Sequence, residues 1–110
     1  MPRKTRTYSR LTRQAHVLMG QHIKLARKTR RLSESDLADR VGIARSTLQR
    51  IEKGDPLVEI GLVFEAATLT GVALFEPDAT SLAPHIERMS DKLALLPKSI
   101  RRPQTADDDF

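Results

Sequence analysis

Residues 32–54, LSESDLADRVGIARSTLQRIEKG, combine a capped helix start, a glycine turn and a second short helix. Ser33 and Asp36 have the spacing of a capping box, in which the hydroxyl and the acid each bond to the other residue's backbone N–H. This pattern predicts that a helix begins at Ser33. Gly42 stands where a left-handed residue ends a helix at low cost, so we expect the helix to end there.

A second helix is predicted from about Ala44 to Lys53, and Gly54 follows it as a stop signal. Leu48 and Ile51 form its apolar face. The other face is polar and basic, and its residues are Arg45, Ser46, Gln49, Arg50 and Lys53. Two helices joined by so short a turn cross at a steep angle, which leaves the second one free to enter the major groove of DNA.

The charge is divided unequally between the two halves of the chain. Residues 1–54 contain fourteen Lys or Arg and four Asp or Glu, a net charge of +10, whereas residues 55–110 contain five and ten, a net charge of −5. A basic half that contains the helix pair suits binding to phosphate with release of counterions. Basic residues also solvate helix faces in many proteins, so charge alone leaves both interpretations open.

Composition limits the size and chemistry of the fold. With 110 residues, of which 39% are hydrophobic, the chain can bury one modest helical core. The absence of cysteine excludes disulfides, thiolate zinc sites and cysteine nucleophiles. Because the apolar runs are too short for a membrane span and no signal peptide is recognisable, we expect a soluble cytoplasmic protein without a membrane partner.

Helical periodicity outlines the remaining elements. A first helix is expected over 13–30, with its buried side formed by Val17, Met19, Ile23 and Ala26. A helix over 59–70 should bury Leu62, Val63, Ala66, Ala67 and Leu69, with Phe64 and Phe75 supplying most of the core's bulk. Ser81 is expected to cap a last helix that reaches Leu96 and carries the apolar stripe Leu82, Ile86, Met89, Leu93 and Leu96. This stripe either folds onto the same core or packs against a second copy of the chain.

Residues 32–54 closely resemble the helix-turn-helix of the phage-repressor (XRE or Cro-like) family. The matching positions are Leu32, Ser33, Leu37, Ala38, Gly42, Ile43, Arg45–Leu48, Arg50–Glu52 and Gly54. The resemblance implies an all-α fold, a five-helix phage-repressor-like domain with an extra C-terminal helix and flexible tails. The expected divisions are a basic flexible arm over 1–12, the DNA-binding domain over 13–75, a C-terminal helix over 76–96 that serves dimerisation, and a flexible tail over 97–110. Glu34 and Ala44 depart from the family pattern, since relatives carry glutamine and a small polar cap there.

This resemblance implies a homodimer that binds double-stranded DNA at a palindromic operator. Arg45 is the first candidate for reading guanine, Gln49 for pairing with adenine, and Ser46 for either role. The candidates for phosphate contacts are Thr47, Arg50 and Lys53, with Arg27 and Arg31 extending the track. No DNA contact is assigned to Glu34.

The segments GQHIKLAR, RRLSESDLADRVG and RSTLQRIEKGDP, together with the final DDDF, are similar to antitoxins encoded beside Hip-type serine/threonine kinases, the HipB-like antitoxins. This similarity implies a repressor of its own operon that neutralises a HipA-like kinase toxin. Residues 97–110 are expected to be disordered alone and to order on the partner. The candidate partner-binding residues are Asp107, Asp108, Asp109 and Phe110.

No enzymatic pattern is present, and we expect neither catalysis, nor a cofactor, nor a metal. His16 and His22 lie six residues apart, so they fall on different faces of one helix, and His85 is far from both in sequence. Neither a glycine-rich phosphate loop nor a serine-nucleophile motif occurs. Two alternatives to the antitoxin stay open: a stand-alone regulator without a toxin, and an interaction module that has lost DNA binding.

Overall fold

The computed structural model describes residues 7–100, and the regular structure within that range is helical. The helices are α1 (Arg10–Thr29), α2 (Glu34–Val41), α3 (Arg45–Glu52), α4 (Ile60–Thr70) and α5 (Ala83–Ala94). Leu74 and Glu76 form an isolated bridge, but residues 7–100 contain no β-strand. The predicted all-α class is therefore confirmed. The chain divides after Pro77 into two compact units, of which the first contains α1–α4 and the second contains α5.

Helix α1 begins at Arg10, three residues before the predicted start. Ser9 is its N-cap, since the Ser9 hydroxyl accepts a hydrogen bond from the Thr12 backbone N–H at 3.4 Å. The prediction of a flexible arm over 1–12 is wrong for residues 10–12, which are helical. Residues 10–12 show no apolar periodicity, so the N-capping serine was the only sequence signal for this earlier helix start. The rest of the predicted arm that falls on residues 1–6 lies outside the described residues.

The boundaries of α2 and α3 follow the sequence pattern. The Ser33 Oγ accepts from the Asp36 N–H at 3.0 Å, and the Asp36 carboxylate accepts from the Ser33 N–H at 3.1 Å. The hydrogen bond from the Ser33 backbone lowers the pKa of the Asp36 carboxyl. Gly42 ends α2 with φ of 85°, and Ala44 precedes α3 as its N-cap. The predicted capping box and glycine turn are confirmed.

Four helix ends in the first unit close with the same reverse turn. In each turn a backbone N–H bonds to the carbonyl five residues earlier, and the donor–acceptor pairs are Leu32–Arg27, Ile43–Ala38, Asp55–Arg50 and Val72–Ala67. The left-handed residue is glycine after α2, α3 and α4, but after α1 it is Arg31, with φ of 58°. A side chain in this conformation costs roughly 1–2 kcal/mol relative to glycine. Arg31 therefore occupies a position where glycine would be more stable.

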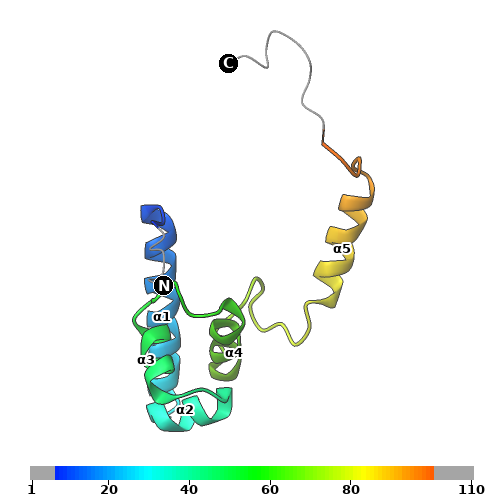
Figure 1. Cartoon of the computed structure of the whole chain (residues 1–110). Coiled ribbons are helices and arrows are strands. Elements are labelled where there is room, and N and C mark those ends of the chain that lie inside the picture. The colour runs from blue at the N-terminus through cyan, green and yellow to red at the C-terminus, as the bar shows by residue number, and fades with distance from the viewer. Residues whose placement is uncertain (1–6, 101–110) are drawn as a thin grey trace. The chain divides into compact units, whose positions relative to one another are not determined.

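The core lies between α1, α2, α3 and α4, which Figure 1 shows coloured from blue to green. Both α1 and α2 pack against α3 and α4. The buried apolar residues are Ile23, Leu37, Ala38, Leu48, Ile51, Val58, Ala66 and Ala67. Half-buried Met19, Val41, Ile43, Leu62, Val63, Val72 and Leu74 surround them. Within residues 7–77 this unit has four helices, because Gly71 ends α4 and residues 72–77 are irregular apart from the Leu74–Glu76 bridge.

Three residues expected in the core are exposed: Val17 by 43%, Leu69 by 37% and Phe75 by 85%. The exposure of Phe75 follows from its backbone. The Glu76 N–H donates to the Leu74 carbonyl at 2.8 Å, and Phe75 between them has φ of 69°. The half-buried Leu74 contributes to the core, whereas this tight turn leaves the Phe75 ring in solvent. The sequence-based prediction that Phe75 contributes to the core is therefore wrong.

Gly20 sets the close approach of α1 to α3. A Cβ atom at Gly20 would lie 2.5 Å from the Ile51 carbonyl oxygen and 2.7 Å from that of Glu52. Backbone atoms cannot move aside as a flexible side chain can, so any larger residue at Gly20 would push the helices apart. The absence of a side chain at this position thus brings the C-terminal end of α3 against α1.

Helix α5 is the helix of the second unit's described part. Its N-cap is Leu82 rather than the predicted Ser81, whose hydroxyl instead accepts a hydrogen bond from the Ala83 N–H at 3.2 Å. Pro84 lies in the first turn, where its missing N–H has no partner to lose. No residue of α5 is buried. Its predicted apolar stripe therefore remains largely uncovered in the single chain.

Candidate nucleic-acid interface

The outward face of α3 brings together the residues predicted to contact bases and phosphates. Leu48 and Ile51 anchor the opposite face, and they are 0% and 2% exposed. The polar face contains the exposed residues Arg45, Ser46, Arg50 and Lys53 and the half-buried residues Thr47 and Gln49. One buried face therefore fixes the helix while the polar face stays accessible.

Glu34, the first residue of α2, joins two side chains of this face. Its Oε1 atom accepts a hydrogen bond from Arg45 Nε at 2.9 Å and another from Gln49 Nε2 at 3.1 Å. The hydrogen bond from Gln49, followed by the smaller effect of the bond from Arg45, lowers the pKa of the Glu34 carboxyl below its ordinary value of 4.5. The Arg45 side chain nevertheless remains 63% exposed. Glu34 is therefore ionised at neutral pH and holds Arg45 without covering it.

Arg50 has a partner in the turn that follows α3. Its Nε bonds to Asp55 Oδ2 at 2.8 Å, and Asp55 Oδ1 accepts from the Leu57 N–H at 2.8 Å. The Arg50 side chain is 46% exposed. This arrangement positions a cation at the C-terminal end of the polar face, where Lys53 is also exposed.

The structure corrects the assignment of Arg27. Its side chain is 6% exposed, with Nε 2.6 Å from Glu52 Oε2 and Nη2 3.0 Å from Glu52 Oε1, while Nη1 donates to the Leu32 carbonyl at 2.9 Å. The Glu52 hydrogen bonds raise the pKa of Arg27. The prediction that Arg27 extends the phosphate track is wrong, because the guanidinium is buried and used within the fold.

Arg31, the other residue predicted on that track, is exposed at the corner between α1 and α2. It is the left-handed residue that closes α1. It precedes Ser33, the N-cap of α2, by two residues in the chain. The structure thus separates the two arginines into a buried structural residue and an exposed one.

Sequence reasoning missed the two acidic partners at this site. Glu34 was noted only as a departure from the family pattern, and Glu52 was given no role. A signal for Arg27 was available, since Gly20, Ile23 and Arg27 recur at helical spacing and share the buried face of α1. A buried arginine requires an acidic partner. Which acid would reach it could not be deduced without the crossing of α1 and α3.

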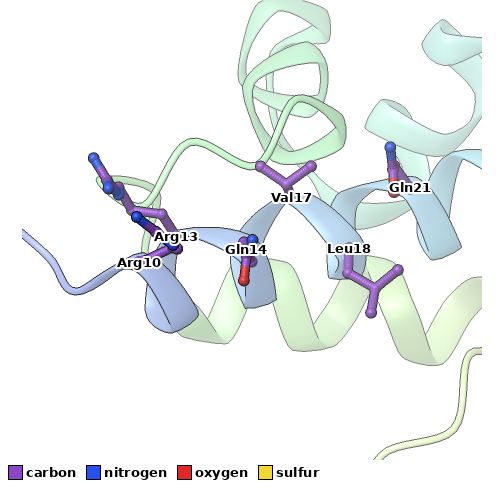
Figure 2. A pocket seen from close by; sticks show the side chains of 6 residues that line it. All are labelled: Arg10, Arg13, Gln14, Val17, Leu18 and Gln21. Atoms are coloured by element: carbon purple, nitrogen blue, oxygen red, sulfur yellow. The ribbon is translucent and has the colours of Figure 1, made fainter.

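A shallow hollow of about 270 Å³ runs along one side of α1. Figure 2 shows the six side chains that line it, namely Arg10, Arg13, Gln14, Val17, Leu18 and Gln21. It is open to solvent and shares no residue with the polar face of α3. Within residues 7–100, no three potential ligands lie close enough to hold a metal ion, and no helix is long and apolar enough to cross a membrane. The predicted partner-binding residues 107–110 lie outside the described residues.

Comparison with known proteins gives a match to the central part of the chain. Residues 23–76 match the helix-turn-helix family model HTH_3. The match begins within α1, includes α2, α3 and α4, and ends at the turn after α4, so it contains the polar face of α3 and Glu34. Neither a curated protein nor a solved structure matches the chain.

Replacing Arg27 with alanine is expected to lower the free energy of unfolding by about 3–5 kcal/mol, because Glu52 would remain buried without its partner. The matched control is Lys28→Ala, an exposed position on the same helix, which should stay within about 0.5 kcal/mol of the unchanged protein. Urea unfolding followed by circular dichroism measures both. Equal effects of the two substitutions would contradict the structural role of Arg27.

Proposed function

Since residues 23–76 form a helix-turn-helix domain, we propose that the protein is a DNA-binding transcriptional repressor that reads its operator through α3. The observation that carries this proposal is the polar face of α3, accessible above a fully buried apolar face. A helix of this kind, crossed by a preceding helix, enters the major groove in helix-turn-helix proteins.

Base reading is assigned to the first turns of α3. Arg45 is the first residue of α3, and a guanidinium there can bond to both acceptors of guanine. Gln49, one turn later, can form the paired bonds that recognise adenine, and Ser46 can donate or accept. Thr47, Arg50, Lys53 and Arg31 are assigned to phosphates, which position the protein without reading sequence.

The conformation of Arg31 supports its phosphate role. Glycine closes the three corresponding turns, but an arginine is retained here in a conformation that disfavours side chains. Residues held in such conformations cluster at functional sites, where the rest of the fold maintains them. A cation at the corner between α1 and α2 is suited to a DNA backbone passing the start of α2.

Arg45→Ala is expected to cost roughly 1–3 kcal/mol on the preferred site and to relax specificity at one base pair. Arg31→Gly is the matched phosphate variant, and it should weaken binding to all sequences and reduce the salt slope by about 1. Selection from a random duplex library, followed by fluorescence anisotropy at several salt concentrations, measures both. If Arg45→Ala loses affinity equally for all sequences, the base-reading role of Arg45 is overturned. If the unchanged protein shows no salt-dependent DNA binding, the proposal of a repressor is overturned.

We place dimerisation on α5. Ile86, Met89 and Leu93 lie within α5, Leu82 is its N-cap, and Leu96 follows its C-terminal end. These five residues alternate at spacings of four and three, the repeat of a two-stranded coiled coil. Ile86, Met89, Leu93 and Leu96 are 56–64% exposed in the single chain. Pairing of two copies would bury this stripe and supply the two-fold symmetry that a palindromic operator requires.

Met89→Lys should disrupt this dimer, because it places a charge in the centre of the apolar stripe. Ala94→Lys adds the same charge on another side of α5 and should leave the dimer intact. Analytical ultracentrifugation of the full chain distinguishes monomer from dimer, and affinity for the palindromic site should fall only in Met89→Lys. A dimer that survives this substitution would place the interface elsewhere.

We further propose that the repressor is the antitoxin of a Hip-type operon, which it autoregulates while neutralising a HipA-like kinase. The similarity of the segments around the helix-turn-helix and of the final DDDF supports this assignment. The charge division also supports it, because the basic half can bind DNA while the acidic half, net −5, binds a protein. The stand-alone regulator without a toxin is the alternative.

Co-expression with the adjacent genes, followed by affinity purification and mass identification, tests the antitoxin. The full chain should recover a serine/threonine kinase, whereas a chain lacking residues 97–110 should recover much less of it. Both chains should bind the operator with nearly equal affinity, which serves as the control. Equal recovery of the kinase would remove the role assigned to Asp107, Asp108, Asp109 and Phe110, and recovery of no kinase would favour the stand-alone regulator.

A further inference from the structure

An acidic residue stands within an otherwise basic face. Glu34 comes from α2, yet its Oε1 is bonded to two residues of α3, Arg45 at 2.9 Å and Gln49 at 3.1 Å. The Glu34 side chain is 26% exposed, whereas that of Arg45 is 63% exposed. The carboxylate therefore lies behind the arginine, and the guanidinium extends from it into solvent.

The two hydrogen bonds determine which edge of the Arg45 guanidinium stays free and which way the Gln49 amide is turned. Glu34 occupies Nε of Arg45, which leaves the terminal Nη1–Nη2 edge of the guanidinium for a paired contact. A carboxylate accepts hydrogen bonds but donates none. Gln49 must therefore turn its amide nitrogen toward Glu34, which leaves its carbonyl oxygen and one N–H for other partners.

The negative charge of Glu34 also acts against unspecific contacts. A carboxylate near the DNA backbone repels phosphate, and Arg45 must give up this partner if it swings toward a phosphate instead of a base. Phosphate contacts supply most of the affinity for unspecific DNA. Removing the charge should therefore favour unspecific DNA more than the operator.

We propose that Glu34 is a specificity-determining positioning residue, which holds Arg45 and Gln49 for base contacts and penalises their use on phosphates. The inference rests on the proposed function, because it concerns how α3 discriminates among DNA sequences. Glu34 acts through its two partners and itself contacts no base.

The test compares Glu34→Gln with the unchanged protein on the selected operator, on single base-pair variants of it and on unrelated duplex DNA. Glutamine preserves the size of the side chain but removes its charge and its obligatory acceptor character. We expect the ratio of operator to unrelated affinity to fall about tenfold, the scale of one good base contact. The loss should be confined to the base pairs read by Arg45 and Gln49, and affinity for unrelated DNA should rise.

Asp39→Asn is the matched control, since it removes an exposed carboxylate from the same helix without touching Arg45 or Gln49. It should leave the base-pair profile unchanged. Urea unfolding of each variant separates a folding defect from a change in recognition, and Arg45→Ala combined with Glu34→Gln should lose the part of the effect that acts through Arg45.

Three results separate the possible failures. If Glu34→Gln and Asp39→Asn raise affinity equally for all sequences, Glu34 contributes only charge and the proposal is overturned. A profile that changes at base pairs insensitive to Arg45→Ala and to replacement of Gln49 also overturns it. If the unchanged protein selects no sequence from the library, the proposed function itself fails.

Discussion

The ion pair between Arg27 and Glu52 joins the elements on which the polar face of α3 depends. It connects the last turns of α1 and α3. Arg27 also donates a hydrogen bond to the Leu32 carbonyl, which ties the turn that leads into α2 to the same guanidinium. A buried charge without its partner is strongly unfavourable, so a packing with a shifted α1–α3 register is penalised. Gly20 permits the same approach by leaving the α3 carbonyls in contact with the α1 backbone. The orientation of α3 is thus set from inside the domain.

The surface of the same helices carries a residue that is unfavourable for stability alone. Arg31 adopts a conformation in which glycine would be more stable, whereas Glu34 is stabilised by its bonds to Arg45 and Gln49. Departures from local stability of this kind are expected at functional sites, where recognition constrains the choice of residue. In the proposed repressor, Arg31 contributes affinity through phosphate and Glu34 contributes discrimination through Arg45 and Gln49.

The two units bury their apolar residues to very different degrees. Helices α1–α4 enclose a core, while α5 presents an apolar stripe and contains no buried residue. Large exposed apolar patches are uncommon on monomeric proteins and mark interaction sites. The proposed pairing of two α5 helices would cover it and would relate the two copies of α3 to the two halves of an operator.

Local patterns in the chain were sufficient for the elements whose ends depend on neighbouring residues. The capping box of Ser33 and Asp36, the left-handed Gly42 and the inward pair Leu48 and Ile51 were all predicted correctly, because each depends on contacts within a few residues. The acidic partner of Arg27 and the partners of Glu34 were not predictable in this way, since helical spacing can place Arg27 on the buried face of α1 but cannot identify an acid 25 residues away that meets it. The crossing of α1 with α3, and of α2 with α3, determines which charges meet. Long-range packing therefore assigned Arg27 to the core and left Arg45 at the surface.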